Sequence, residues 1–334
     1  MSVGGCRAWC PPTGMRVFYL MVCLFGLGGC SILLPSTPHA TTPERSCAPL
    51  HPVRFQIHDE RNAEAVKPDL PFSTQSLEVA RVMNAVPLLT ELTALERAGE
   101  THSLAFMELR QSLSDRLLLT LFEVSSLTAE LVCERDRADQ VADRMDEVDA
   151  SLVKRLTLAS IVIGGVAAVV SGGIGLAGGS DVANNAATLA GGVVASLFGG
   201  AALFAASQQD FSHERNLLGE LWHGPPQSSV FSPAIWRFFQ KHRTDGTRTI
   251  REEVLQAWRQ QGRLGEPGSS GEEERSALVF GKGGRYTSTD LRARASMLET
   301  LEAHVQLLSE ELEVFLREII QRRIQVGPQE GAQS

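Results

Sequence analysis

TLASIVIGGVAAVVSGGIGLAGG occupies residues 157–179, SDVANN occupies 180–185, and AATLAGGVVASLFGGAALFAA occupies 186–206. From Leu156 to Ser207 the only ionisable side chain is that of Asp181. Two apolar arms around a polar turn are typical of a helical hairpin that lies in lipid or against other helices. We therefore expect residues 156–207 to form an apolar hairpin, with one transmembrane helix in each arm if both arms cross a bilayer.

Small residues recur along both arms of this hairpin at four-residue steps. The rows are Gly164, Ala168 and Gly172 on the first arm and Gly191, Ala195 and Gly199 on the second. Residues four apart share one face of a helix, and small side chains on that face let two backbones approach closely. These six residues are predicted to pack the two arms together.

Heptad repeats flank the hairpin on both sides. The first row is Leu117, Val124, Leu131, Ala138, Met145 and Leu152, and the second is Leu291, Leu298, Val305, Leu312 and Ile319. Residues 103–163 contain neither Pro nor Gly, so the first heptad helix is expected to run directly into the first arm. The predicted fold class is all-α, with long coiled-coil helices flanking a glycine-rich apolar helical hairpin.

The remaining segments are also predicted to be mostly helical. Residues 73–155 form the first coiled-coil region, with an interruption at Pro87 and an end to the first piece at Gly99. Residues 208–288 form a mixed region with a linker. Its expected parts are a helical continuation over 208–222, a packed aromatic cluster over 231–239, a short helix over 249–260 and a flexible linker over 262–275. Residues 289–326 form the C-terminal coiled-coil helix, with Thr289-Asp290 at its start.

The first 29 residues are typical of a secretory signal peptide. Arg16 precedes an apolar run over residues 17–26, which is too short to span a bilayer. The run ends in Leu27-Gly28-Gly29-Cys30, which closely resembles the lipobox of bacterial lipoproteins. In that family the peptide before the cysteine is removed and the cysteine is acylated, which implies that Cys30 is a lipidated mature N-terminus. The other interpretation is an uncleaved signal anchor. Met15 is a second candidate start.

The same resemblance implies a cellular location. Ser31 after the cysteine resembles lipoproteins that are sorted to the outer membrane, so we expect a periplasm-facing lipoprotein of the bacterial cell envelope. Residues 30–72 are rich in Pro, Ser and Thr and are predicted to be an extended tether. In an oxidising compartment Cys47 and Cys133 form either a disulfide or two unpaired thiols, and the sequence leaves both open.

Two further resemblances concern the hairpin. Residues 16–30 and 157–206 resemble the signal and the glycine-zipper two-helix segment of small bacterial envelope lipoproteins. The resemblance implies a structural or interaction role through helix packing. Long helices around an apolar hairpin also resemble α-helical pore-forming toxins, which supports an alternative function in membrane insertion.

The sequence contains no recognisable catalytic or metal-binding pattern. His213, His223 and His242 lack an HExxH spacing, and residues 280–285 (FGKGGR) lack the phosphate-loop spacing, so a turn before the last helix is expected there. A net charge of −8 without a basic tract argues against nucleic acid as a partner. We therefore expect a non-enzymatic protein without a cofactor, whose partners are membrane lipid and either further copies of itself or other envelope proteins.

Overall fold

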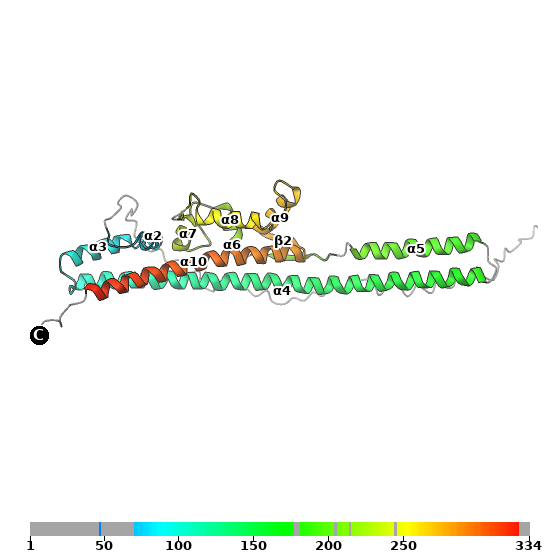
Figure 1. Ribbon diagram of the computed structural model, residues 1–334, viewed down its shortest axis with the longest axis horizontal. Helices are drawn as coiled ribbons and strands as arrows, with labels where there is room; N and C mark the ends of the chain where they lie inside the picture. The colour runs from blue at the N-terminus through cyan, green and yellow to red at the C-terminus, as the bar shows by residue number, and fades with distance from the viewer. Residues whose placement is uncertain are drawn as a thin grey trace, which may run out of the picture. The chain divides into compact units, whose positions relative to one another are not determined.

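The computed structural model describes residues 47, 70–176, 181–203, 206–213, 215–243 and 246–326. All of them belong to one unit of the chain, Cys47–Ser334, which is built mainly from helices (Figure 1). The predicted all-α class is confirmed, since the strands of this part are two four-residue segments. The predicted signal peptide, Cys30 and most of the predicted tether lie outside the described residues.

The long helix α4, Leu104–Leu176, has 73 residues. At about 1.5 Å per residue it rises roughly 110 Å. Two helices pack against it in succession (Figure 1): α10, Ser288–Val326, along its first part and α5, Asp181–Leu203, along its end. The prediction that the coiled-coil helix continues into the first arm is therefore confirmed.

The heptad rows form the interface between α4 and α10. The fully or nearly fully buried members are Leu117, Val124, Leu131, Ala138 and Met145 on α4, and Leu291, Leu298, Val305 and Leu312 on α10. Leu152 and Ile319, at the ends of the two rows, are only half-buried. Arg135 of α4 pairs with Glu302 of α10 at 2.8 Å. Apolar residues every seven positions thus meet along one seam, as coiled-coil packing requires.

Two short helices precede α4. They are α2, Thr74–Val82, and α3, Val86–Arg97. Asn84 between them has a φ of 55°, and Pro87 lies in the first turn of α3, where its missing N–H costs no helical hydrogen bond. The predicted interruption is confirmed. Helix α2 is fastened to α10, because Ser73 donates from both N and Oγ to the Glu318 carboxylate, at 2.8 and 2.7 Å.

The prediction that a helix continues over residues 208–222 is wrong. Strand β1, Gln209–Ser212, pairs antiparallel with β2, Gly283–Tyr286, and a separate helix α6 covers Leu217–His223. Gly283 has a φ of 94°, and a Cβ there would lie 2.2 Å from the Phe211 carbonyl oxygen. The glycine-rich segment after residue 280 therefore serves strand pairing. The pairing joins residues more than 70 positions apart. Periodic patterns within one segment cannot predict a contact over such a distance in the sequence.

The remaining helices are α7, Pro233–Gln240, α8, Ile250–Gln260, and α9, Ser270–Phe280. The first two carry the expected aromatic packing, with Trp258 fully buried. The predicted flexible linker over 262–275 is wrong in its second half, because Ser269 caps α9 by accepting from Glu272 N. Helix α10 begins at Ser288, slightly earlier than predicted, since Thr287 and Asp290 exchange hydrogen bonds at its start.

Candidate functional site

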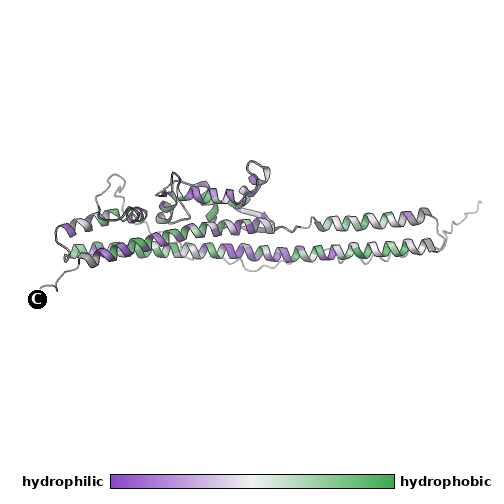
Figure 2. Ribbon diagram, in the orientation of Figure 1, coloured by the Kyte–Doolittle hydropathy of each residue, from purple (hydrophilic) through white to green (hydrophobic). Residues whose placement is uncertain are grey.

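The apolar hairpin formed by the end of α4 and by α5 is the candidate functional site. Figure 2 shows little hydrophilic colour over this part of the two helices. In the most apolar stretch of α4 no residue is buried. The exposed aliphatic side chains of the hairpin are Leu158, Ile161, Val162, Val166, Val169 and Val170 on α4 and Leu189, Val193, Val194 and Leu197 on α5. A continuous exposed apolar surface of this kind marks an interaction site.

The two arms approach most closely through small residues. A Cβ added to Gly191 would lie 2.1 Å from Ala167 Cβ, and one added to Gly164 would lie 4.0 Å from Ala195 Cβ. At Gly172 and Gly199 an added Cβ meets nothing within 4 Å. The predicted rows thus place Gly164, Gly191 and Ala195 at the arm–arm contact.

An open groove of about 460 Å³ lies over this contact. Its lining residues are Gly164, Ala167, Ala168, Ser171, Gly172, Thr188, Gly191 and Gly192, so Ala168 and Gly172 face the groove. The residue that the sequence reasoning missed is Ala167, which meets Gly191 directly. The signal was available, because Ala167 and Ser171 make another four-residue step of small residues.

Within the described part of the hairpin, one arm meets the requirements for a membrane span by length and composition. Among the described residues, that helix is α4, with the candidate stretch Leu104–Gly173. The apolar stretch described on α5 is shorter, Thr188–Ala201. The expectation of a transmembrane helix in each arm is therefore supported for the first arm alone.

The base of the hairpin is tied to the coiled-coil part by a hydrogen bond. Ser207 N, just after α5, donates to both carboxylate oxygens of Asp149 at 2.9 and 3.1 Å. Lys154 and Arg155 follow on α4 and are exposed. After Ser207 the chain enters β1, so both ends of the hairpin are held within the same structured unit.

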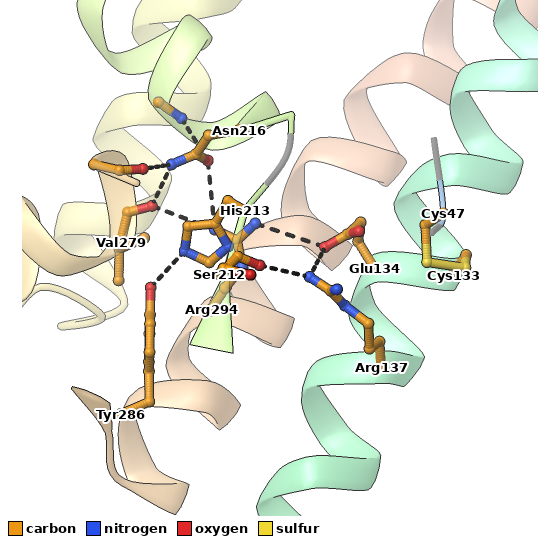
Figure 3. Close-up of polar contacts among 12 residues, drawn as sticks. Cys47, Cys133, Glu134, Arg137, Ser212, His213, Asn216, Val279, Tyr286 and Arg294 are labelled. Atoms are coloured by element: carbon orange, nitrogen blue, oxygen red, sulfur yellow. Dashed lines mark hydrogen bonds and ion pairs between the residues drawn. A yellow bond between two sulfur atoms is a disulfide. The ribbon is translucent and has the colours of Figure 1, made fainter. Parts of the chain in front are cut away.

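A buried polar cluster lies where α4, α10 and β1 meet (Figure 3). The guanidinium of Arg294 on α10 is fully buried and lies 3.9 Å from the Glu134 carboxylate of α4. Arg137 pairs with the same carboxylate at 3.1 Å and also donates to the Ser212 carbonyl at 3.0 Å. Glu134 therefore faces two cations. Burial lowers the pKa of Arg294 to about 10, and the charge of Glu134 acts in the opposite sense.

His213 belongs to this cluster and is buried. Its Nε2 lies 2.8 Å from the Tyr286 hydroxyl, which donates its single proton to the Leu278 carbonyl at 2.9 Å. Nε2 must therefore carry the imidazole proton and donate to Tyr286, and Nδ1 has no hydrogen-bond partner. Burial, then the charges of Arg294 and Arg137, lowers the pKa of His213 from 6.5 to about 3. The ring is neutral at neutral pH and serves packing.

The other histidines do not join His213. His223 ends α6, and His242 pairs through its backbone with Thr249 in an isolated bridge. Within the described residues no group of three His, Cys, Asp or Glu side chains could hold a metal ion. The structure therefore does not bring these sequence candidates together.

Cys47 and Cys133 form a disulfide, with their Cα atoms 5.7 Å apart. The bond fastens the chain before α2 to the middle of α4, next to Glu134 (Figure 3). The sequence left open either a disulfide or two unpaired thiols, and the structure contains the disulfide. It closes a loop between residues 86 positions apart.

Two buried groups predict opposite effects of pH on stability. Between pH 6.5 and 3 the unfolded chain binds a proton that folded His213 does not, so acid destabilises the fold. Burial raises the pKa of Glu130 from 4.5 to about 7, against the nearby charge of Arg215, so acidification between pH 7 and 4.5 stabilises the fold. His213→Gln should therefore gain stability relative to wild type, by about 1.4 kcal/mol for each pH unit lowered from 6 to 4.

Urea unfolding at several pH values measures this difference. A His213→Gln curve parallel to that of the wild type would contradict the assignment.

Comparison of the chain with protein-family models, with curated proteins and with solved structures finds no significant match.

Proposed function

We propose that this chain is a non-enzymatic, lipid-anchored protein of the bacterial cell envelope whose α4–α5 hairpin enters a membrane. The observation that carries the proposal is the exposure of the hairpin's aliphatic side chains. Val169 is 76% exposed and Leu189 is 69% exposed. Full burial of each such side chain stabilises by about 1.5–3 kcal/mol, so ten of them in water favour a lipid environment strongly.

The length of the hairpin agrees with a bilayer. From Leu156 to its end at Leu176, α4 rises about 30 Å, which is the thickness of the hydrocarbon core. The coiled-coil seam before it is already filled by α10, and the apolar side chains left exposed on that part, such as Phe122, are interspersed with charged residues. The hairpin is the membrane element and the coiled coil is the water-exposed element.

The route of entry follows from the two ends of the hairpin. Asp149 and Ser207 hold both ends together, and β1 is paired with β2 directly afterwards. Both arms therefore return to the same side of the membrane. With Cys30 acylated, that side is the one that carries the lipid anchor, and the protein acts there as a structural or interaction partner through its helices.

Two variants test the two modes of attachment separately. Cys30→Ser, with residues 1–29 replaced by a cleavable signal that does not depend on a lipobox, should remove the mass of the acyl groups and leave the protein in the membrane fraction, since the hairpin still holds it. Adding Val169→Asp to Cys30→Ser should move the protein to the soluble fraction. Mass spectrometry and fractionation after a salt wash measure these outcomes.

Cys23→Ser is the matched control, because Cys23 lies within the apolar run that precedes the lipobox. That variant should keep both the acyl groups and the membrane fraction. An unchanged mass in Cys30→Ser would disprove lipidation at this residue, and a soluble Cys30→Ser protein would disprove insertion of the hairpin.

A pore-forming role is the second candidate, supported by the unbroken course of α4 from the coiled coil into the hairpin. In such proteins several hairpins assemble around a channel. Purified protein should then release a small fluorophore from lipid vesicles with a steep dependence on protein concentration. Membrane binding without release supports the structural role instead.

A further inference from the structure

We propose that Lys154 and Arg155 form a binding site for the anionic phosphate head groups of membrane lipids at the base of the hairpin. The inference rests on the proposed insertion of the hairpin and adds the lipid class that this part of the protein recognises. It concerns the two cations and their surroundings on α4.

The position of the two residues fits the head-group layer. They are the last ionisable residues of α4 before its apolar arm, and both are exposed. With the arm in the hydrocarbon core from about Thr157 onward, their charged groups lie within one helical turn of the lipid phosphates. Long basic side chains commonly reach this layer while their stems lie along apolar surface.

The two positive charges have no ion-pair partner among the described residues, although the Asp149 carboxylate, whose Ser207 N–H donor is uncharged, lies about 7.5 Å before Lys154 along the helix axis. Neither residue makes a side-chain hydrogen bond with another described residue, whereas the nearest acids on α4 have partners of their own. Asp143 and Asp146 pair with Arg292 at 2.8 and 2.6 Å, and Asp149 accepts from Ser207 N. Glu147, which is exposed, lies about two turns before Lys154.

The other side of the base adds one acid, Asp210 on β1, which lies opposite Arg285 in the strand pairing. Residues 206–208, which follow α5, are Ala, Ser and Gln. A basic residue near an anionic membrane surface attracts it within about one Debye length, roughly 8 Å at physiological ionic strength. Two such residues should together strengthen binding to an anionic membrane roughly tenfold, against the opposing net charge of the whole chain.

The experiment compares neutral with anionic vesicles. The mature chain from residue 30 onward, carrying Cys30→Ser so that no acyl chain contributes, is mixed with phosphatidylcholine vesicles or with vesicles containing about 30 mol% phosphatidylglycerol. Binding to the anionic vesicles should be roughly tenfold stronger, and salt at about 0.5 M should remove the difference. Lys154→Gln with Arg155→Gln should remove it as well, while binding to neutral vesicles stays unchanged.

Arg110→Gln with Arg144→Gln is the matched control. Both residues are exposed cations on the coiled-coil part of α4, and Arg144 lies roughly 15 Å before Lys154, beyond the Debye length. This control should keep the anionic preference. Free inorganic phosphate should not compete, because the site faces a membrane surface.

The outcomes separate the two proposals. A protein that binds both vesicle types equally well overturns the head-group site and leaves insertion of the hairpin standing. A protein that binds neither overturns the proposed function and, with it, this site. Equal loss of the preference in the matched control also overturns the assignment to Lys154 and Arg155, since the effect would then reflect net charge alone.

Discussion

Replacing Val169 with aspartate should lower the partition of the hairpin into membranes about a hundredfold. Val169 is the most exposed large aliphatic residue of the α4 arm, and it lies near the middle of the apolar stretch. A carboxylate near the centre of a membrane helix costs about 2.5–3.5 kcal/mol, and a short aspartate side chain does not reach the interface. Vesicle co-sedimentation of the Cys30→Ser form measures the partition.

Phe122 provides a matched control for this substitution. It lies on the same helix, is 69% exposed, and belongs to the coiled-coil part that the proposal keeps in water. Phe122→Asp should therefore leave the partition within about twofold of the parent, because surface substitutions of this kind change little. Equal effects of the two substitutions would contradict the division of α4 into a water-exposed part and a membrane part.

Glu134→Gln should lower the free energy of unfolding by about 3 kcal/mol. The substitution keeps the size of the side chain but removes the negative charge that faces Arg294 and Arg137. Arg294 is fully buried, and its other contacts are long, at 3.4 Å to Asn216 Oδ1 and 3.3 Å to the Val279 carbonyl. Leaving a buried cation without its counter-ion is strongly destabilising. Urea unfolding followed by circular dichroism measures the change.

Two comparisons make the Glu134 result specific. Glu310→Gln, on the exposed side of α10, should change stability by no more than about 0.5 kcal/mol. Combining Glu134→Met with Arg294→Met should recover most of the loss, since two apolar side chains of similar length replace the buried pair. A double variant as unstable as Glu134→Gln would show that Arg294 does not depend on this carboxylate.

The sequence determined the parts of the fold that depend on local periodicity. The heptad rows of α4 and α10, the break before Pro87 and the run of α4 into the apolar arm all follow from spacing within one segment. The small-residue rows likewise predicted three residues of the arm–arm contact. They missed Ala167, because the exact rotation of each arm depends on its partner.

The strands and the buried cluster could not be predicted in this way. Gln209–Ser212 has helical neighbours and becomes a strand only because Gly283–Tyr286 lies beside it. His213 is buried only because Tyr286 and Arg294 are brought to it by the same packing. These contacts join residues far apart in the chain, and no pattern within one segment indicates which other segment it will contact.

The sequence by itself thus determined that two heptad helices flank an apolar hairpin, since each of these features is a periodic pattern of side chains along one helix. Only the tertiary structure decided that Cys47 pairs with Cys133, that β1 closes the base of the hairpin with β2, and that the hairpin stays exposed. The hairpin stays exposed unless another segment has a free apolar face that can pack against it. In this protein α10 meets α4 before the hairpin begins, and no other described segment covers the apolar arms.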